Sequence, residues 1–447
     1  MINREEIREK RNGVISGFGV KNDMTFLTKR IQKEEQLSSV EVRESFQRDR
    51  DRIIHSRAFR RLMHKTQIFN ANMGDHYRNR LTHTLEVSQI ARSIGKVLGL
   101  NDELIEAISL GHDLGHTPFG HIGERTLHMI ISGRTYTHEE MKINNLGGFK
   151  HNFQGLHLVD NLETCSNSWG GMNLTLAVRE GILKHTDRKI KIWEMKEGEK
   201  VKKKEEVNYE CLNMEDINID LPSFTLEGQV VAIADEIAQC THDLEDGIRS
   251  GIITLKDIQN CELVKKVCEK KSINLNELNT TVEIRNVLIK TLVGFLIEDV
   301  CNATFDNLEK LFPQGDYPKF TSKNDVYTQD VVKFSKEVSE DEKQLSSLKS
   351  NLVIMSQQVS QADSKAEYLI KKIFKAYFLH PQQLPDYILK RYFIKKGRIL
   401  DKANLESEIL KMQKDTAFVR LICDHISGMT DQFVAREYKK LFEAEHF

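Results

Sequence analysis

The segment 111–124 (GHDLGHTPFGHIGE) holds three histidines, one aspartate and one glutamate within fourteen residues, directly after an apolar helical pattern. His112 and Asp113 are neighbours, and neighbours on a helix diverge by about 100°, so both cannot face the same core surface. Both can reach a group bound at the end of that helix. The fold must therefore bring this helix end beside other polar groups that neutralise a buried carboxylate.

Two further segments place ionisable residues on apolar helical faces. His83 opens a stripe of apolar residues at steps of three and four that runs to the end of its helix. Asp235 follows the apolar run VVAIA, and its face continues with Gln239, His242 and Asp243. A lone histidine on such a stripe is more often a satisfied core residue than a ligand, so His83 by itself carries little weight.

Together these positions predict a metal site. Four buried ionisable groups on three helices, His83, His112, Asp113 and Asp235, would be costly unless a cation neutralised them. Mixed imidazole and carboxylate ligands suit Mn²⁺, Fe²⁺, Co²⁺, Ni²⁺ or Zn²⁺ better than Ca²⁺, and Mg²⁺ stays among the candidates. Four protein ligands leave positions for water and a substrate oxygen, as metal-assisted phosphate chemistry requires.

A second layer of polar residues surrounds the predicted ligands. His116 lies one turn beyond His112. His121 and Glu124 are three residues apart on one helix face, where the carboxylate can orient the imidazole and raise its pKa. An imidazole held in this way can transfer a proton during hydrolysis. A surface pair of polar residues explains the same spacing equally well.

Three arginines are candidates for binding phosphate groups. Arg80 stands one turn before His83, whereas Arg60 and Arg61 lie in the segment RDRDRIIHSRAFRRL. For Arg60 and Arg61 individually, solvation of a helix face is at least as good an explanation. The chain has no P-loop and no GxGxxG motif, so a Walker-type nucleotide site is not expected.

The composition favours a mostly helical protein, because only 6 of 447 residues are proline and long stretches repeat apolar residues with a period of 3.6. A net charge of −1 gives no overall field that would draw the chain onto nucleic acid or an acidic membrane. Seven scattered cysteines without a CxxC pair argue against a disulfide framework and a thiolate zinc site. The start, MINREEIREK, has no apolar signal, and no run is long enough to span a bilayer, so we expect a cytoplasmic protein.

The periodicity predicts helices over 42–69, 79–98 and 120–131, an apolar helix that runs into the histidine-rich segment, and another that starts near Thr225. Gly99 is the predicted end of the second helix, and Asn101 is the predicted N-cap of the next. Gly115 and Pro118 are expected to stop the helix before them.

The segment 188–210, with the insertion extending to about 218, is rich in lysine and glutamate around an EGEK turn, and predicts a solvated hairpin or insertion. We expect three parts: an arm over 1–40, a core over 41–250 and a C-terminal helical region over 251–447. The clearest loop in the last part is LFPQGDYP, at 311–318.

Several motifs occur in an order that resembles one family, the HD-domain deoxynucleoside triphosphate triphosphohydrolases, or bacterial dGTPase-like proteins. The motifs, which cover most of the chain, are RDRDRIIHSRAFRRLMHKTQIF, RLTHTLEV, HDLGHTPFGHIGE, GGFKHNFQG, ADEIAQCTHDLEDG, LHPQQLPDYILKRY and DHISGMTDQFVAREY. An HD pair alone would say little, because HD folds host many phosphohydrolases. The resemblance implies an all-α fold, an HD-domain helical bundle with additional C-terminal helices.

The resemblance also implies roles for individual residues. The implied metal ligands are the four named above. Proton transfer, or activation of the attacking water, would fall to His121 with Glu124. The implied substrate contacts are Arg80 and His116 to phosphate oxygens, His151 near the phosphates, and Gln67 and Asp243 to the deoxyribose 3′-hydroxyl.

The chain departs from the family pattern at Gln239, one turn after Asp235, where related proteins usually carry a tyrosine against C2′ of the sugar. A tyrosine there excludes a ribose 2′-hydroxyl by contact. Glutamine is smaller and can hydrogen-bond a hydroxyl, so we expect weaker discrimination against ribonucleotides.

The activity that the resemblance implies is metal-dependent hydrolysis of dGTP or several dNTPs to a deoxynucleoside and inorganic triphosphate. Family members are usually homo-oligomers, often hexamers, and some are activated by a second dNTP. An HD phosphohydrolase acting on nucleoside monophosphates or alarmone-type nucleotides is one alternative. A nucleotide-sensing or DNA-binding protein is another, although the intact His121 and Glu124 count against it because a receptor needs no general acid. Neither a nucleic acid nor a membrane partner is indicated.

Overall fold

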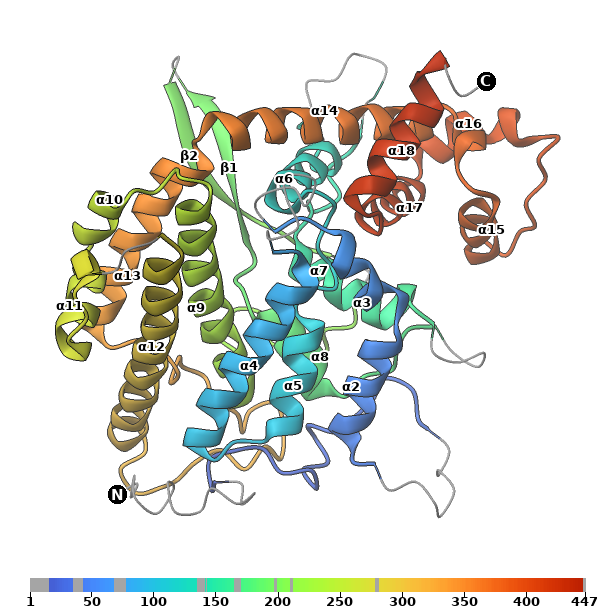
Figure 1. Cartoon of the computed structure of the whole chain (residues 1–447). Helices are drawn as coiled ribbons and strands as arrows, with labels where there is room; N and C mark the ends of the chain where they lie inside the picture. Colours follow the sequence, from blue (N-terminus) through green and yellow to red (C-terminus); the bar gives the residue numbers. More distant parts are fainter. Residues whose placement is uncertain are drawn as a thin grey trace.

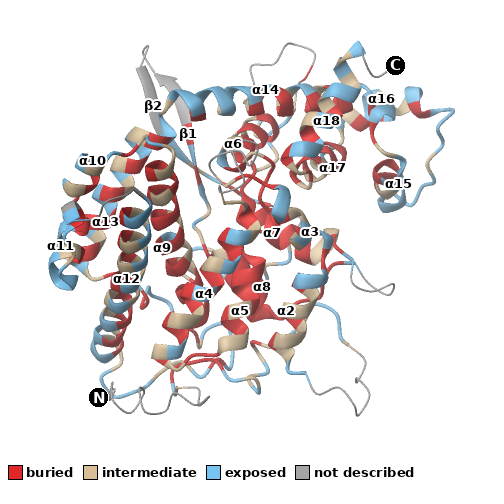
Figure 2. Cartoon of the chain, in the orientation of Figure 1, coloured by how far each residue is buried: buried red, intermediate tan, exposed pale blue. Residues whose placement is uncertain are grey.

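The computed structural model describes residues 16–34, 43–67, 78–134, 141, 143–164, 170–196, 199–209, 212–277 and 281–444. Within these residues the regular secondary structure is helical apart from one two-stranded hairpin, which confirms the predicted all-α class. Four helices pack side by side at the centre: α4 (Arg80–Leu98), α5 (Asp102–Gly111), α8 (Leu176–Lys184) and α9 (Leu226–Arg249) (Figure 1). Buried residues are concentrated in this group (Figure 2).

Helices on both sides cover the central group (Figure 1). On one side α2 (Ser45–His55) packs against α5 and is followed by α3 (Arg57–Arg61). On the other side α12 (Thr281–Leu311) and α13 (Lys336–Lys349) pack against α9. The short helices α10 (Leu255–Gln259) and α11 (Glu262–Lys271) complete that side.

The C-terminal helices lie across one end of the central group (Figure 1). There α14 (Gln357–Leu379) packs on α6 (Gly120–Ile131), and α17 (Thr416–Ser427) contacts both. The remaining helices are α7 (His151–His157), α15 (Asp386–Lys395), α16 (Leu405–Lys414) and α18 (Asp431–Phe442). Single turns of other helix types cover Leu62–His64, Leu158–Leu162, Leu275–Glu277, Ser350–Ile354 and Pro381–Gln383.

The predicted helix ends around the HD segment are confirmed. The Asn79 side chain caps α4, and Gly99 ends that helix in the left-handed conformation at φ 67°. Asn101 caps α5 by accepting a hydrogen bond from the Leu104 N–H. Thr225 caps α9 in the same way. These caps satisfy N–H groups that would otherwise be left without partners at the ends of buried helices.

The continuous helix predicted over 42–69 is wrong, because Ser56 interrupts it. Ser56 is extended (φ −70°, ψ 154°), and its hydroxyl accepts a hydrogen bond from the Phe59 N–H, so that it ends α2 and caps α3. Serine favours caps because its side chain competes for backbone N–H groups. Within the described part of this segment, helical structure ends at His64. Residues 42 and 68–69 of the predicted helix lie outside the described residues.

The lysine- and glutamate-rich segment forms the predicted hairpin, with β1 (Lys189–Lys196) antiparallel to β2 (Glu199–Glu206). The predicted loop at 311–318 begins at Leu311, which is still the last residue of α12, and is non-helical from residue 312 onward. Five cysteines are described, and none of them is part of a disulfide. In the described part of the chain, no helix is long and apolar enough to cross a membrane.

Residues 16–34 pack on the central helices. Buried Glu227, in the first turn of α9, accepts hydrogen bonds from the Val20 N–H at 2.8 Å and the Asn101 N–H at 3.1 Å. Arg30 pairs with buried Asp49 of α2 at 2.5 Å. The division of the chain at residues 40 and 250 stays a prediction.

A glycine sets the distance between the turn after α5 and helix α7. A Cβ at Gly115 would lie 2.1 Å from both the Gly155 nitrogen and the His151 oxygen. Both contacts are to backbone, which cannot move aside as a flexible side chain can. The close approach therefore requires glycine, and it brings His151 beside the histidine-rich turn.

We predict that Gly115→Ala lowers the free energy of unfolding by about 3 kcal/mol or more, because the added methyl must push α7 away from the turn. Chemical denaturation would measure the loss. Gly294→Ala in α12 is the matched control, since nothing lies within 4 Å of its added Cβ. The control should gain about 0.5–1 kcal/mol from the better helix propensity of alanine. Equal stability of the two variants would contradict the assignment of this contact.

Candidate active site

The predicted site residues come together from five elements. Helix α4 supplies Arg80 and His83, and the turn after α5 supplies His112, Asp113 and His116. Helix α6 carries His121 and Glu124, and helix α7 carries His151. Helix α9 carries Asp235, Gln239 and Asp243.

Three of the four predicted metal ligands form a tight buried cluster. One ligand atom from each of His83, His112 and Asp113 lies within 4.8 Å of the others. Asp235 adjoins them, with its Oδ1 3.0 Å from His83 Nε2 and 3.8 Å from His112 Nε2. Bonds of about 2.1 Å to one ion put neighbouring ligand atoms roughly 3.0–3.4 Å apart, so these separations suit a shared cation.

The hydrogen bonds of His112 test whether the site fits a metal. Its Nδ1 donates to the Ser109 carbonyl at 2.6 Å, which leaves a lone pair on Nε2. That Nε2 is buried and has no hydrogen-bond partner among the described residues. A buried nitrogen lone pair beside two carboxylates is what a divalent cation would satisfy. The residues present therefore fit a divalent metal.

Asp113 carries the most deeply buried negative charge of the cluster. Its Oδ2 accepts a 2.7 Å hydrogen bond from Arg80, and its Oδ1 lies 3.2 Å from His116 Nε2. Burial alone would raise the pKa of Asp113, but His116, His112 and Arg80 hold that pKa well below its usual value. Burial and the Arg80 charge in turn lower the pKa of His116 well below the usual histidine value. Asp113 is therefore ionised, with Arg80 supplying the positive charge and a neutral His116 ring contributing a hydrogen bond.

The two other ligands, His83 and Asp235, influence each other's pKa. Burial opposes protonation of His83, yet its hydrogen bond to Asp235 raises its pKa. Burial would raise the pKa of Asp235, but His83 and His112 lower it below the usual value. The Asp235 side chain is 24% exposed, so the cluster is open to solvent on this side.

Glu124 joins two imidazoles. Its Oε1 accepts hydrogen bonds from the His151 backbone N–H and ring Nδ1, both at 2.8 Å, and its Oε2 lies 3.5 Å from His121 Nδ1. Burial would raise the pKa of Glu124, but His151 and His121 hold it well below its usual value. The His121 side chain is 58% exposed, so an ionised, buried carboxylate holds an imidazole at the rim of the site.

Asp113, His116 and His151 form a second group close enough to hold an ion. The rings of His116 and His151 are stacked, with centroids 3.9 Å apart and planes at 15°. Lone pairs lie in the ring plane, so two parallel rings cannot both point at one ion. Arg80 also adds a positive charge at Asp113. The stacking of the rings and the nearby Arg80 charge therefore argue against a second cation at this group.

The structure places the remaining predicted residues as follows. Gln239 Nε2 lies 3.5 Å from His121 Nε2, and buried Asp243 lies 3.4 Å from Lys349 Nζ. Gln67 Oε1 and Asp243 Oδ1 are buried without a hydrogen-bond partner in the described part. Arg61 pairs with Glu163 at 3.1 Å, whereas Arg60 is exposed.

Two histidines in the site received no role from the sequence. His185, at the end of α8, lies 3.1 Å from His151 through its Nε2, and its ring contacts His112. His242 lies 3.2 Å from His83 through its Nδ1. His185 follows an apolar helix as His112 does, and this shared pattern was the signal that could have found it.

The C-terminal region holds the turn that carries these groups. Asp431, the first residue of α18, accepts hydrogen bonds at 2.8 Å from the N–H groups of Phe119 and Thr66. Phe119 has a left-handed backbone (φ 61°), which is costly for an aromatic residue and needs such support. Buried Lys65 donates hydrogen bonds to the His116 carbonyl of the same turn and, at 3.0 Å, to the Ser427 carbonyl of α17.

Comparison with known proteins identifies the family. Residues 80–239 match the HD domain, and residues 332–440 match the phosphohydrolase-associated domain. A deoxyguanosinetriphosphate triphosphohydrolase-like protein of Geobacter metallireducens is 36% identical over 90% of this chain and 89% of its own length. The chain belongs to this family of HD-domain proteins. A protein of the same description from Bartonella tribocorum is 36% identical over 91% of both chains.

Membership confirms the family inferred from the motifs and makes the protein an HD-domain phosphohydrolase. The matched HD segment begins at Arg80 and ends at Gln239, so it contains all four predicted metal ligands. The second matched segment contains Asp431, which supports the turn between α5 and α6.

We predict that ionised Glu124 makes metal-free protein less stable as the pH falls. Its folded pKa lies below the ordinary value of 4.5, so its contribution is present above pH 4.5 and is lost as the pH falls below it. Between pH 4.5 and 3.5, Glu124→Gln should reduce the slope of unfolding free energy against pH by up to about 1.4 kcal/mol per pH unit.

Denaturant titrations of chelator-treated protein at several pH values would measure this slope. The control is Glu227→Gln, a buried glutamate whose pKa burial raises, so that its substitution should not reduce the slope. Wild-type slope in Glu124→Gln would show that Glu124 is not held ionised.

Proposed function

We propose that the protein hydrolyses deoxynucleoside triphosphates, dGTP or several dNTPs, to a deoxynucleoside and inorganic triphosphate. A divalent ion held by His83, His112, Asp113 and Asp235 would assist the reaction. The observation that carries the proposal is the buried, unpartnered His112 Nε2, which lies in a cluster of ligands open to solvent at Asp235. The names of the relatives support the choice of substrate.

Divalent ions polarise phosphoryl oxygens and make water a better nucleophile at neutral pH. Beside the ligands, an anion could bind to the charged guanidinium of Arg80 and to the hydrogen-bonding rings of His116 and His151. Arg80 is 2% exposed and is already held by Asp113, so its position is fixed before substrate arrives. A fixed donor loses little conformational freedom when it binds a phosphate oxygen.

His121 is suited to moving a proton at the rim of the site. Glu124 can only accept a hydrogen bond, so it places a hydrogen on His121 Nδ1. The Nε2 of His121, which has only the 3.5 Å contact with Gln239 Nε2 in the described part of the chain, is then the nitrogen that can give or take a proton. Hydrolysis adds water across the bond between the α-phosphorus and the 5′ oxygen. The departing 5′ oxygen must gain a proton, and His121 Nε2 is our candidate for its donor.

Two buried oxygens are our candidates for recognition of the sugar. Gln67 Oε1 and Asp243 Oδ1 each lack a hydrogen-bond partner in the described part of the chain, and a sugar hydroxyl can donate to such an acceptor. Gln239, beside His121, is the candidate that decides whether a 2′-hydroxyl is tolerated. We further propose that the protein is a cytoplasmic homo-oligomer. A dNTP bound at a second site would activate it.

We predict that the purified protein, assayed with each dNTP singly and in mixtures with Mn²⁺ or Mg²⁺, releases deoxynucleoside and inorganic triphosphate. Ion-exchange chromatography separates these products from diphosphate and phosphate. Activity only in mixtures would indicate activation by a second nucleotide. Release of diphosphate or phosphate alone, or no turnover, would overturn the proposal in favour of another phosphate ester or a sensing role.

We predict that two histidine substitutions separate metal binding from proton transfer. His112→Ala should lose both bound metal and turnover, because it removes a ligand whose only free nitrogen faces the cluster. His121→Ala should keep the metal and lose on the order of 10²-fold or more in rate, the usual scale of acid–base catalysis. Metal analysis and rate measurement on the same preparations would test both. Full metal content in His112→Ala would contradict the ligand assignment.

A further inference from the structure

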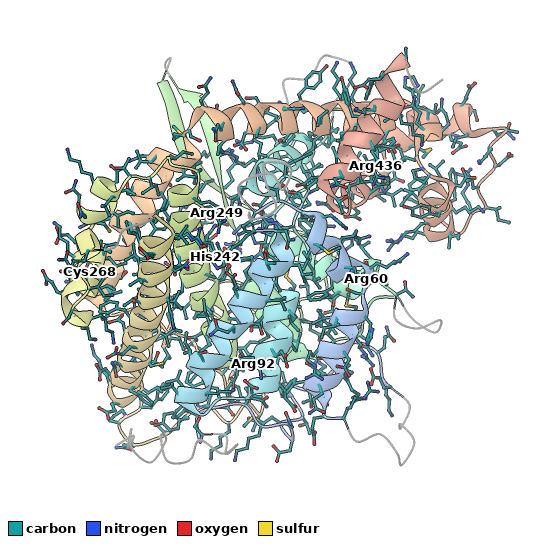
Figure 3. The ribbon with its side chains drawn as sticks, viewed as in Figure 1. Arg60, Arg92, His242, Arg249, Cys268 and Arg436 are labelled. Atoms are coloured by element: carbon teal, nitrogen blue, oxygen red, sulfur yellow. The ribbon has the colours of Figure 1, made fainter. Side chains whose placement is uncertain are left out.

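His242 stands directly behind a proposed metal ligand. Its Nδ1 lies 3.2 Å from His83 Nδ1, and the two rings meet edge to face with centroids 5.3 Å apart. Figure 3 shows His242 on α9, between that helix and α4. The His242 residue is 4% exposed, so the contact is shielded from solvent.

A carboxylate occupies the other side of the His242 ring. Its Nε2 contacts Glu86 Oε2, and Glu86 in turn accepts a 3.0 Å hydrogen bond from Arg78 Nε. Arg78 also pairs with Glu245 at 2.5 Å. The four groups form one line of contacts from His83 outward, in which both nitrogens of the His242 ring are engaged.

The order of donors along this line follows from the carboxylate. Glu86 can only accept, so the hydrogen of a neutral His242 ring lies on Nε2, and its Nδ1 is an acceptor. The facing Nδ1 of His83 must then be the donor. With Nδ1 engaged by His242, it is the Nε2 of His83 that faces the ligand cluster, 3.0 Å from Asp235 Oδ1. There Nε2 donates to the carboxylate, and a metal bound between the two groups would take the place of this hydrogen.

We propose that His242 is a positioning residue for metal binding, with Glu86 behind it. The pair selects the tautomer of His83 whose Nε2 lone pair faces the ligand cluster, and it holds the ring in that orientation. Outer partners of this kind stabilise metal-ligating histidines in general. The inference rests on the metal site of the proposed function but on neither its substrate nor its products.

Metal affinity tests the proposal without substrate. The variants are His242→Phe, which cannot accept a hydrogen bond, and His242→Gln, whose Oε1 can accept from His83 while its Nε2 donates to Glu86. Competition with a chelator would give the Mn²⁺ dissociation constant of each. We expect about 10–100-fold weaker binding in His242→Phe and a return to within about threefold of wild type in His242→Gln.

Two controls separate positioning from packing. His425→Phe removes a half-buried imidazole, whose Nε2 has no hydrogen-bond partner among the described residues, and should leave Mn²⁺ affinity unchanged. Glu86→Ala removes the carboxylate from a side chain that is 40% exposed, so the variant should fold even if His242→Phe does not. We expect about tenfold weaker Mn²⁺ binding in Glu86→Ala. The visible spectrum of the Co²⁺-loaded protein should change in both His242→Phe and Glu86→Ala.

The outcomes distinguish this inference from the proposed function. Wild-type affinity in folded His242→Phe, or in Glu86→Ala, would overturn the positioning role while leaving the metal site intact. Equal losses in His242→Gln and His242→Phe would also overturn it, because packing and not the hydrogen bond would then be responsible. Wild-type protein that binds neither Mn²⁺ nor Co²⁺ would overturn the metal site itself.

Discussion

A buried carboxylate has to be neutralised by its surroundings, and the neighbourhood of Asp113 is organised around that requirement. Arg80 comes from α4 and His116 from the turn after α5, so the charge of Asp113 ties together two segments of the chain. The same turn is pressed against α7 at Gly115, where no side chain can be accommodated. The turn also carries His112, and the helix α6 that follows it carries His121 and Glu124, so the positions of these three polar groups depend on this arrangement.

The inner histidines share one design. Each has one ring nitrogen committed to an outer group: His112 to the Ser109 carbonyl, His151 to Glu124, and His185 to the Ile182 carbonyl at 2.7 Å. The other nitrogen of each ring is thereby turned toward the interior of the site. The three rings are therefore held in fixed orientations instead of rotating freely. His151 Nε2 and His185 Nε2 lie 3.1 Å apart, so one of these two nitrogens donates a hydrogen bond to the other, whereas His112 Nε2 offers its lone pair to the cluster.

The sequence predicted the parts of this protein that depend on local pattern. The ends of α4 and the start of α5 follow from Asn79, Gly99 and Asn101, because caps are decided by a few neighbouring residues. Ser56 was missed because a serine within an apolar helical pattern fits a helix or a cap equally well. His185 lies 73 positions beyond His112, from 112 to 185, so their contact depends on how α5 and α8 pack and not on spacing along the chain.

The hydrogen bonds from Phe119 and Thr66 to Asp431 have a consequence for how the protein is made. A ribosome releases the chain from its N-terminus, so all four proposed metal ligands emerge nearly two hundred positions before Asp431, from 235 to 431. Until α18 has folded onto them, the strained backbone at Phe119 and the residue before Gln67 lack this support. The ligand-bearing helices are therefore synthesised before the site can reach its final geometry. The site reaches that geometry only after the C-terminal region has packed against the turn.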